Sequence, residues 1–183
     1  MKKAFLLLVA MLAFAPPALA ADDAANVMVM PQKVASAEVK LLDAAGQDAG
    51  TATITVAPHG LLVHIEATGL APGWHGVHFH GTGDCSDHAE HFKKSGGHAA
   101  HDGEKHGLLS AADPHAGDLP NIFASADGTA NAEFLTSAIE LDMLQDKDGG
   151  ALMIHAGPDD YRTDPSGNSG DRVSCGVISS ERR

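Results

Sequence analysis

Short apolar runs with a period of two, and almost no helical periodicity, constrain the fold of this 183-residue chain most strongly. Such alternation indicates half-buried β-strands, because successive side chains of a strand point to opposite faces. Only residues 137–145 favour a helical turn. The sequence therefore predicts an all-β fold. The predicted strands contain Ala37, Val39 and Leu41; Ala52, Ile54 and Val56; Leu61, Val63, Ile65 and Ala67; Ala130, Ala132 and Phe134; Leu152 to His155; and Val173, Cys175 and Val177.

Two long segments, residues 81–120 and 157–171, are polar and rich in glycine, aspartate and histidine. Ordered loops of this length in a compact domain are usually functional. A shorter segment, 44–50, carries two glycines and fits a hairpin connection. We expect an antiparallel β barrel or sandwich with two large functional loops, and no internal repeat or linker indicates a second domain.

The first twenty residues are typical of an export signal. Two lysines precede an apolar segment, residues 4–15, and a small-residue cleavage site follows at 18–20. We expect a signal peptide at 1–20 and one exported domain at 21–183, free of the membrane after cleavage. An uncleaved membrane anchor is the alternative, although the apolar segment is short for a span. The formal net charge of −12, without a basic patch, argues against a nucleic-acid partner.

Two cysteines, Cys85 and Cys175, remain in the exported part of the chain. An oxidising compartment would join them. A crosslink over so long a loop would stabilise the fold by about 4 to 5 kcal/mol in the chain-entropy model. A pair of free thiols is the alternative.

Twelve histidines is an unusual number for this length. Within GWHGVHFHGTGDC, residues 73–85, His78 and His80 would project from one face of a strand because they are two residues apart. His75 would face the opposite side. His155, at the end of the apolar segment ALMIH, offers a further imidazole to the first face. Solvent-exposed histidines would be the ordinary interpretation of one such pair, but several histidines together favour a metal site.

A second set of ligand-type residues lies in the longer loop. His98, His106 and His115, followed by Asp118, are separated by 8, 9 and 3 residues. Three imidazoles and one carboxylate complete a tetrahedral zinc site. A closed set of four ligands predicts a structural zinc ion that keeps the loop ordered.

These motifs resemble those of the bacterial secreted copper,zinc superoxide dismutases. The resemblance runs from about residue 37 to residue 178 and rests on GWHGVHFH, GGH, KHG, PHAGDLPN, MIHAGPDD and GNSGDRVSCGVI. It implies an eight-stranded antiparallel Greek-key β barrel in the periplasm. The implied activity is the disproportionation of superoxide to dioxygen and hydrogen peroxide, which protects the cell envelope from oxidative damage.

The resemblance also implies the cofactors, copper and zinc, and their ligands. His98 would bridge the two ions as an imidazolate, which two adjacent divalent charges make accessible near neutral pH. The copper ion would cycle between oxidation states, while zinc would be redox-silent. The implied copper ligands are His78, His80, His98 and His155, and the implied zinc ligands are His98, His106, His115 and Asp118.

Two further residues take roles from the resemblance. Arg172 matches the active-site arginine, catalytic together with His98, and its guanidinium can dock an anion of superoxide's size. Asp159 matches a carboxylate that links a copper-binding and a zinc-binding imidazole. Taken alone, the arginine would be interpreted as a surface salt-bridge partner and the aspartate as an ordinary loop residue.

The remaining histidines receive no ligand role. We expect His75 to be a hydrogen-bonded core residue and His59 and His64 to be solvated. The role of His88, His91 and His101 stays open. Because His91 precedes a phenylalanine, as the family's bridging histidine often does, a ligand shifted from His98 is an alternative.

The sequence departs from the family in two places. Ala99 to His101 replace an FNP-like segment, and residues 87–97 lengthen the disulfide loop. The alternative function is a periplasmic copper or zinc buffer or carrier on the same barrel, using the extra histidines with Met28 and Met30. Such a protein would not need an active-site arginine. The sequence leaves open whether Trp74 packs in the core or at a subunit contact, and whether the protein is a homodimer.

Overall fold

A computed structural model describes residues 35–179. The expected signal peptide, residues 1–20, and the methionines Met28 and Met30 lie outside the described residues. Within the described range, no helix has both the length and the apolar character needed to cross a membrane.

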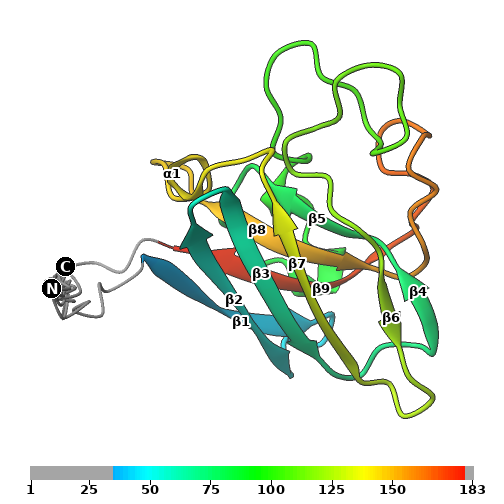
Figure 1. Ribbon diagram of the computed structural model, residues 1–183. Coiled ribbons are helices and arrows are strands. Elements are labelled where there is room, and N and C mark those ends of the chain that lie inside the picture. Colours follow the sequence, from blue (N-terminus) through cyan, green and yellow to red (C-terminus); the bar gives the residue numbers. More distant parts are fainter. Residues whose placement is uncertain (1–34, 180–183) are drawn as a thin grey trace, which may run out of the picture. The chain divides into compact units, whose positions relative to one another are not determined.

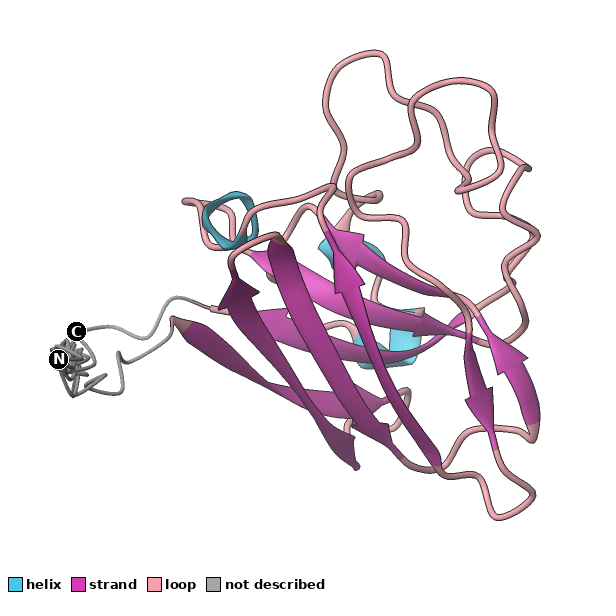
Figure 2. Ribbon diagram, viewed as in Figure 1, coloured by secondary structure: helices cyan, strands magenta, loops and turns pink. Residues whose placement is uncertain are grey.

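The described residues form nine β-strands and very little helix (Figures 1 and 2). Seven strands make one antiparallel sheet in the order β5-β8-β9-β1-β2-β3-β7, and β4 pairs with β6 in a second sheet. The strands are β1 Ser36–Asp43, β2 Asp48–Ala57, β3 Gly60–Ala67, β4 Gly73–His75, β5 Val77–His80, β6 Ile122–Ala124, β7 Ala130–Thr136, β8 Gly150–His155 and β9 Arg172–Ile178. The helices are α1 Leu141–Leu144 and two 3-10 turns, η1 His88–Glu90 and η2 Lys93–Ser95.

The strands β1, β2 and β3 follow the predicted alternation. The apolar residues of β1 and β3 are buried on one face, and the residues between them are more exposed. The β1–β2 turn is closed by Asp43, whose carboxylate accepts the amide N–H groups of Ala45 and Gln47, both at 2.8 Å. Since β2 already begins at Asp48, the connection is shorter than the predicted 44–50.

The all-β antiparallel fold is confirmed, but the described strands number nine and not the expected eight. The segment GWHGVHFH is divided at Gly76, so that β4 pairs with β6 whereas β5 pairs with β8. The predicted helical turn at 137–145 is confirmed only over α1. In β9, Val177 is 37% exposed and its neighbour Ile178 is buried, so the predicted apolar face of that strand is wrong at its end.

Two groups of buried residues form the core. The larger lies between the inner faces of the strands. The smaller contains the disulfide between Cys85 and Cys175, whose Cα atoms are 5.9 Å apart, and which joins the segment after β5 to strand β9. The expected pairing of the cysteines is therefore confirmed. Phe92, Ala151 and Met153 pack around this crosslink.

Trp74 lies on the surface and not in the core. Its side chain is 56% exposed and contacts Phe123, its cross-strand partner from β6, edge to face with ring centroids 5.2 Å apart. The two predicted long loops meet on one side of the sheet, where Figure 1 shows the green connection from β5 to β6 beside the orange connection from β8 to β9. Hydrogen bonds join them, among them His106 N–H to Asp164 Oδ1 at 2.9 Å.

Candidate metal centre

Four histidines from three parts of the chain gather beside the edge strand β5. His78 and His80 project from β5, and His155 ends the neighbouring strand β8. His98 comes from the long loop and is held by an isolated β-bridge to His80. Each of the four residues offers a ligand atom within 4.8 Å of the others. The structure thus brings together all four residues predicted as copper ligands.

Three of these histidines use only one ring nitrogen in hydrogen bonds. His78 Nε2 faces Asp159 Oδ2 at 2.8 Å, His80 Nδ1 faces the Gly96 carbonyl at 3.0 Å, and His155 Nδ1 faces the Gly170 carbonyl at 3.1 Å. These oxygens accept, so the facing nitrogens carry the protons.

The opposite ring nitrogens have no hydrogen-bond partner although they are buried: His78 Nδ1, His80 Nε2 and His155 Nε2. Each therefore presents a lone pair into the same space. Burying these nitrogens without a partner costs free energy, unless a positive ion binds to the lone pairs. Burial also lowers the pKa of His78 to about 4 and that of His155 to about 3, despite the hydrogen bonds that raise them. Burial lowers the pKa of His80 as well. The rings are neutral at pH 7, as metal ligands must be, so the residues fit a copper ion.

A carboxylate organises the second set of ligands. Asp118 Oδ1 lies 2.9 Å from His98 Nδ1, 3.0 Å from His106 Nδ1 and 3.7 Å from His115 Nδ1. His115 Nδ1 also lies 3.3 Å from His98 Nδ1. The group on this side whose ligand atoms all lie within 4.8 Å of one another consists of His78, His98, His106 and Asp118, without His115. The four predicted zinc ligands are adjacent, with His115 the most distant from the carboxylate.

Charge in this second group is balanced by protons. Burial alone would lower the pKa of His106, but hydrogen bonds to Asp118 and Asp159 raise it to about 9. Burial alone would raise the pKa of Asp118, but hydrogen bonds from His106 and His98 lower it strongly. Asp118 and Asp159 compensate the charge of the His106 imidazolium, and a divalent cation bound at Nδ1 in place of its proton would be compensated by Asp118 in the same way. The donor set fits zinc.

Asp159 connects the two groups. Its Oδ2 accepts from His78 Nε2 at 2.8 Å, and its Oδ1 lies 3.0 Å from His106 Nε2. Asn121 fixes the aspartate's backbone from both sides, since its amide donates to the Asp159 carbonyl at 2.9 Å and accepts the Asp159 N–H at 2.8 Å. Sequence reasoning gave Asn121 no role, although it stands in the quoted motif PHAGDLPN.

Arg172 is the first residue of β9 and pairs with His155, one of the histidines predicted as copper ligands. Its NH1 donates to the Phe92 carbonyl at 2.9 Å and to Ser95 Oγ at 3.2 Å, and its NH2 donates to the Gly96 carbonyl at 2.7 Å. Among the described residues it forms no ion pair with a carboxylate. The simple salt-bridge interpretation is therefore wrong, and its positive charge is not cancelled by direct contact.

The other histidines lie outside both ligand groups. His75 is buried, and its ring nitrogens contact the carbonyls of His155 and Ala71, both at 2.7 Å, which confirms its place in the core. His64 is partly exposed beside Glu66 and Glu133. His59, His88, His91 and His101 do not join either group, so the alternative of His91 as the bridging residue finds no support in the geometry.

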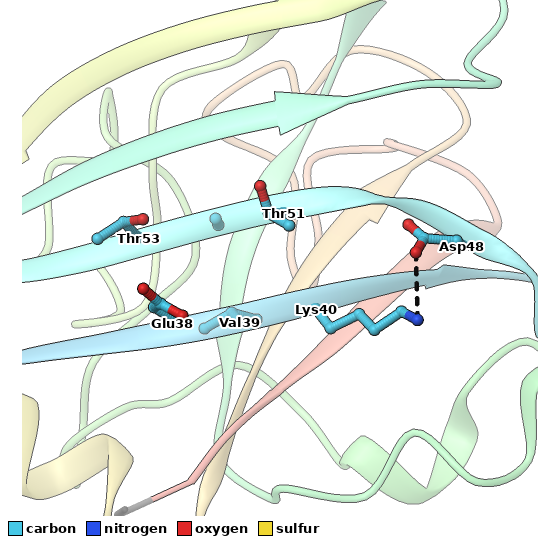
Figure 3. Close-up of a pocket in the computed structure, with 7 residues that line it drawn as sticks. Glu38, Val39, Lys40, Asp48, Thr51 and Thr53 are labelled. Carbon is cyan, nitrogen blue, oxygen red and sulfur yellow. Dashed lines mark ion pairs between the residues drawn. The ribbon is translucent and has the colours of Figure 1, made fainter.

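A cavity of about 490 Å³ lies elsewhere, over β1 and β2 (Figure 3). Lys40 and Asp48 form an ion pair there, with Nζ and Oδ2 3.1 Å apart, and the lining contains no histidine or cysteine. The metal-ligand chemistry of the described residues is therefore concentrated between the two long loops.

The sequence is similar to those of known proteins. The family model for copper/zinc superoxide dismutase matches residues 48–178. The chain is 47% identical over 151 residues to a Cu-Zn superoxide dismutase of Caulobacter vibrioides, covering 79% of this chain and 84% of that protein. It is 38% identical over 148 residues to Cu-Zn superoxide dismutase 2 of Aquifex aeolicus, covering 78% and 85% of the two chains.

Solved structures agree with the sequence matches. A superoxide dismutase-like protein from Bacillus subtilis superposes with a TM-score of 0.71 at 35% identity, covering 79% of this chain and 99% of that one. The Cu/Zn superoxide dismutase of Brucella abortus superposes with a TM-score of 0.66 at 32% identity, with coverage of 79% and 99%. The match to the family model, together with relatives that are 47% and 38% identical, shows that this chain belongs to the bacterial copper/zinc superoxide dismutase family.

Proposed function

We propose that the protein is a superoxide dismutase, which converts two superoxide ions and two protons into dioxygen and hydrogen peroxide. One observation carries the proposal most directly. Three neutral, buried imidazoles present unpartnered nitrogens to one space, beside a histidine shared with a second ligand group. The names of the relatives support the same reaction.

The residues assigned to the metals follow from the two groups. A copper ion bound there supplies one-electron redox chemistry and a zinc ion supplies a fixed positive charge. We assign copper to His78, His80, His98 and His155, and zinc to His98, His106, His115 and Asp118.

His98 is the residue we assign to proton transfer. Its Nδ1 faces Asp118 on the zinc side at 2.9 Å, and its ring stacks on His78 with centroids 4.0 Å apart. The other ring nitrogen is left for the copper side. When it is not bound to copper, that nitrogen could hold a proton inside the site where peroxide must be protonated, so His98 is suited to deliver it.

Arg172 is the residue we assign to substrate binding. A guanidinium has five N–H donors, and the three contacts to the disulfide loop leave at least two for an anion. The fixed positive charge attracts superoxide against the net negative charge of the chain, and the orientation held by the loop directs the anion to the copper side.

We infer a periplasmic location. The pattern of residues 1–20 supports export, and a disulfide between the two cysteines fits an oxidising compartment. The cleaved chain, residues 21–183, would then be the working enzyme.

The test is the rate of superoxide loss with purified protein loaded with copper and zinc, in excess EDTA so that free copper does not contribute. His155→Ala should lower the rate at least about 100-fold because a copper ligand is lost. His59→Ala, which removes an exposed histidine outside both groups, is the matched control and should leave the rate unchanged. A protein that binds both metals without turnover would contradict the dismutase proposal and favour the metal buffer.

A further inference from the structure

Ser95 is a fully buried residue between the anion-binding arginine and a copper-side histidine. It ends the turn η2 in the disulfide loop and has no exposed surface. Its hydroxyl donates to the Phe92 carbonyl at 2.8 Å. The same oxygen lies 3.2 Å from Arg172 NH1 and 3.3 Å from His80 Nδ1. One hydroxyl therefore contacts groups assigned to both substrate binding and metal binding.

The hydrogen-bonding capacity of this hydroxyl is fully used. A serine hydroxyl has one donor and two acceptor positions. The donor goes to Phe92, one acceptor position receives an Arg172 NH1 hydrogen, and the other faces the His80 Nδ1–H, whose shorter hydrogen bond goes to the Gly96 carbonyl. The neighbouring Gly96 carbonyl is shared in the same way, at 3.0 Å from His80 Nδ1 and 2.7 Å from Arg172 NH2. Arginine and histidine are thus joined through two common acceptors.

The backbone of the loop holds these acceptors in place. His91 and Phe92 both adopt the left-handed conformation, with φ of 58° and 54°. The Phe92 ring is buried against the disulfide, while its carbonyl receives the Ser95 N–H at 3.1 Å and Arg172 NH1 at 2.9 Å. Asp87 Oδ2 accepts the Lys94 N–H at 3.0 Å and fixes the turn from the other side. The hydroxyl therefore has little freedom to leave its position.

We propose that Ser95 is a positioning residue for the dismutase reaction, which orients the Arg172 guanidinium for an anion by accepting from its NH1. The inference rests on the proposed function for its role in turnover. The residue does not touch the reacting atoms, and acts through the arginine. Replacement by alanine would leave one of the two NH1 hydrogens without an acceptor, so that the side chain could rotate away from the orientation that receives the anion.

The test uses azide as an anion probe of the copper- and zinc-loaded protein. Azide binding is followed by the change in the visible absorption of the copper site, independently of turnover. The variants are Ser95→Ala, Arg172→Gln, the double variant, and Ser169→Ala. Ser169 is the matched control, because it is fully buried and its hydroxyl donates to the carbonyl three residues earlier, at 2.7 Å, as that of Ser95 does. It makes no side-chain contact with Arg172.

We expect Ser95→Ala to weaken azide binding about three- to tenfold, which corresponds to the loss of one hydrogen bond of ordinary strength. Ser169→Ala should leave azide binding unchanged. Arg172→Gln should weaken it further, and the double variant should be no weaker than Arg172→Gln alone, because the serine acts through the arginine. Copper affinity of Ser95→Ala should stay within about twofold, since Gly96 still accepts from His80.

Several results would overturn the inference: unchanged azide affinity in Ser95→Ala, an equal loss in Ser169→Ala, an additive loss in the double variant, or no dependence of azide affinity on Arg172. The wild-type rate of superoxide loss separates this inference from the proposed function. If that rate is absent while the azide pattern holds, the dismutase proposal fails and Ser95 remains a residue that positions an anion-binding arginine.

Discussion

Gly167 occupies a position that no larger residue can take without moving the link between the two metal groups. Its φ is +61°, and a Cβ atom built there would overlap Asp159 Oδ1 and lie 2.8 Å from His106 Nε2. Asp159 holds one imidazole from each group, so displacement of its carboxylate would release His78 and His106 together. The absence of a side chain at residue 167 therefore keeps both ligands oriented.

Gly167→Ala should weaken zinc binding about 10- to 100-fold, the effect of losing a carboxylate that orients ligating histidines. The measurement is competition with a chelator of known zinc affinity. Gly69→Ala is the control, since its φ of +75° imposes a similar backbone penalty but nothing lies within 4 Å of the added atom. If both variants bind zinc equally, the carboxylate link does not govern zinc affinity.

The residues that form the candidate metal site could be predicted from the sequence, whereas the residues that orient them could not. Histidines two residues apart in a strand, or 8 and 9 residues apart in a loop, indicate a metal site by their residue type and spacing alone. The roles of Ser95, Asn121 and Gly167 depend on contacts between loops distant in sequence. In particular, Asn121 and Asp159 meet only because the two long connections pack together. No local sequence pattern predicts a contact between segments so far apart in the chain.

At the scale of secondary-structure elements, the alternation predicted the strands but not their partners. The buried faces of β1 and β3 follow from residues 37–41 and 61–67. The pairing of β9 with β1, and the change of partner at Gly76, depend on long-range packing. The turns η1 and η2 were not predicted either, because the left-handed conformation at Phe92 is unusual for a residue other than glycine.

The disulfide ties the loop of η1 and η2 to strand β9. It closes a loop of 90 residues, and in the chain-entropy model such a crosslink restricts the unfolded chain strongly. Phe92 packs against it and at the same time presents its carbonyl to Arg172. The crosslink therefore supports both stability and the orientation of the arginine.

Replacing both Cys85 and Cys175 by serine should lower the free energy of unfolding by about 2 to 5 kcal/mol. Urea unfolding of the fully metal-loaded proteins measures this change, with the single variant Ser169→Ala as a control for loss of one buried polar group. The same double replacement should also weaken azide binding, since the Phe92 carbonyl loses its support. A change in unfolding free energy below about 1 kcal/mol would contradict the stabilising role assigned to the crosslink.

At the scale of the whole molecule, the buried histidines give the metal-free fold two opposite dependences on pH. For His78 and His155, burial lowers the folded-state pKa to about 4 and about 3, below the unfolded value of about 6.5. Below pH 6.5 the unfolded chain therefore binds more protons, and stability is lost as the pH falls. For His106, hydrogen bonds to Asp118 and Asp159 outweigh burial and raise the folded-state pKa to about 9. Its contribution is complete below pH 6.5 and is lost as the pH rises towards 9.

The metal-free protein should consequently be most stable near neutral pH. Each proton of difference between the folded and unfolded states changes the free energy of unfolding by about 1.4 kcal/mol per pH unit. The loss should therefore approach at least about 3 kcal/mol per pH unit on the acidic side, where His78 and His155 both differ, and about 1.4 kcal/mol per pH unit on the alkaline side, where His106 differs. The zinc-loaded protein should not show the alkaline loss, because a bound cation would replace the His106 Nδ1 proton that faces Asp118, while the Nε2 proton still faces Asp159. Urea unfolding from pH 5 to pH 9, with and without zinc, measures the acidic and the alkaline loss of stability.

Asp159→Asn should reduce the alkaline loss of stability in the metal-free protein, since one carboxylate no longer raises the pKa of His106. An alkaline limb that is equally steep with zinc bound would show that His106 keeps its proton and is not a zinc ligand.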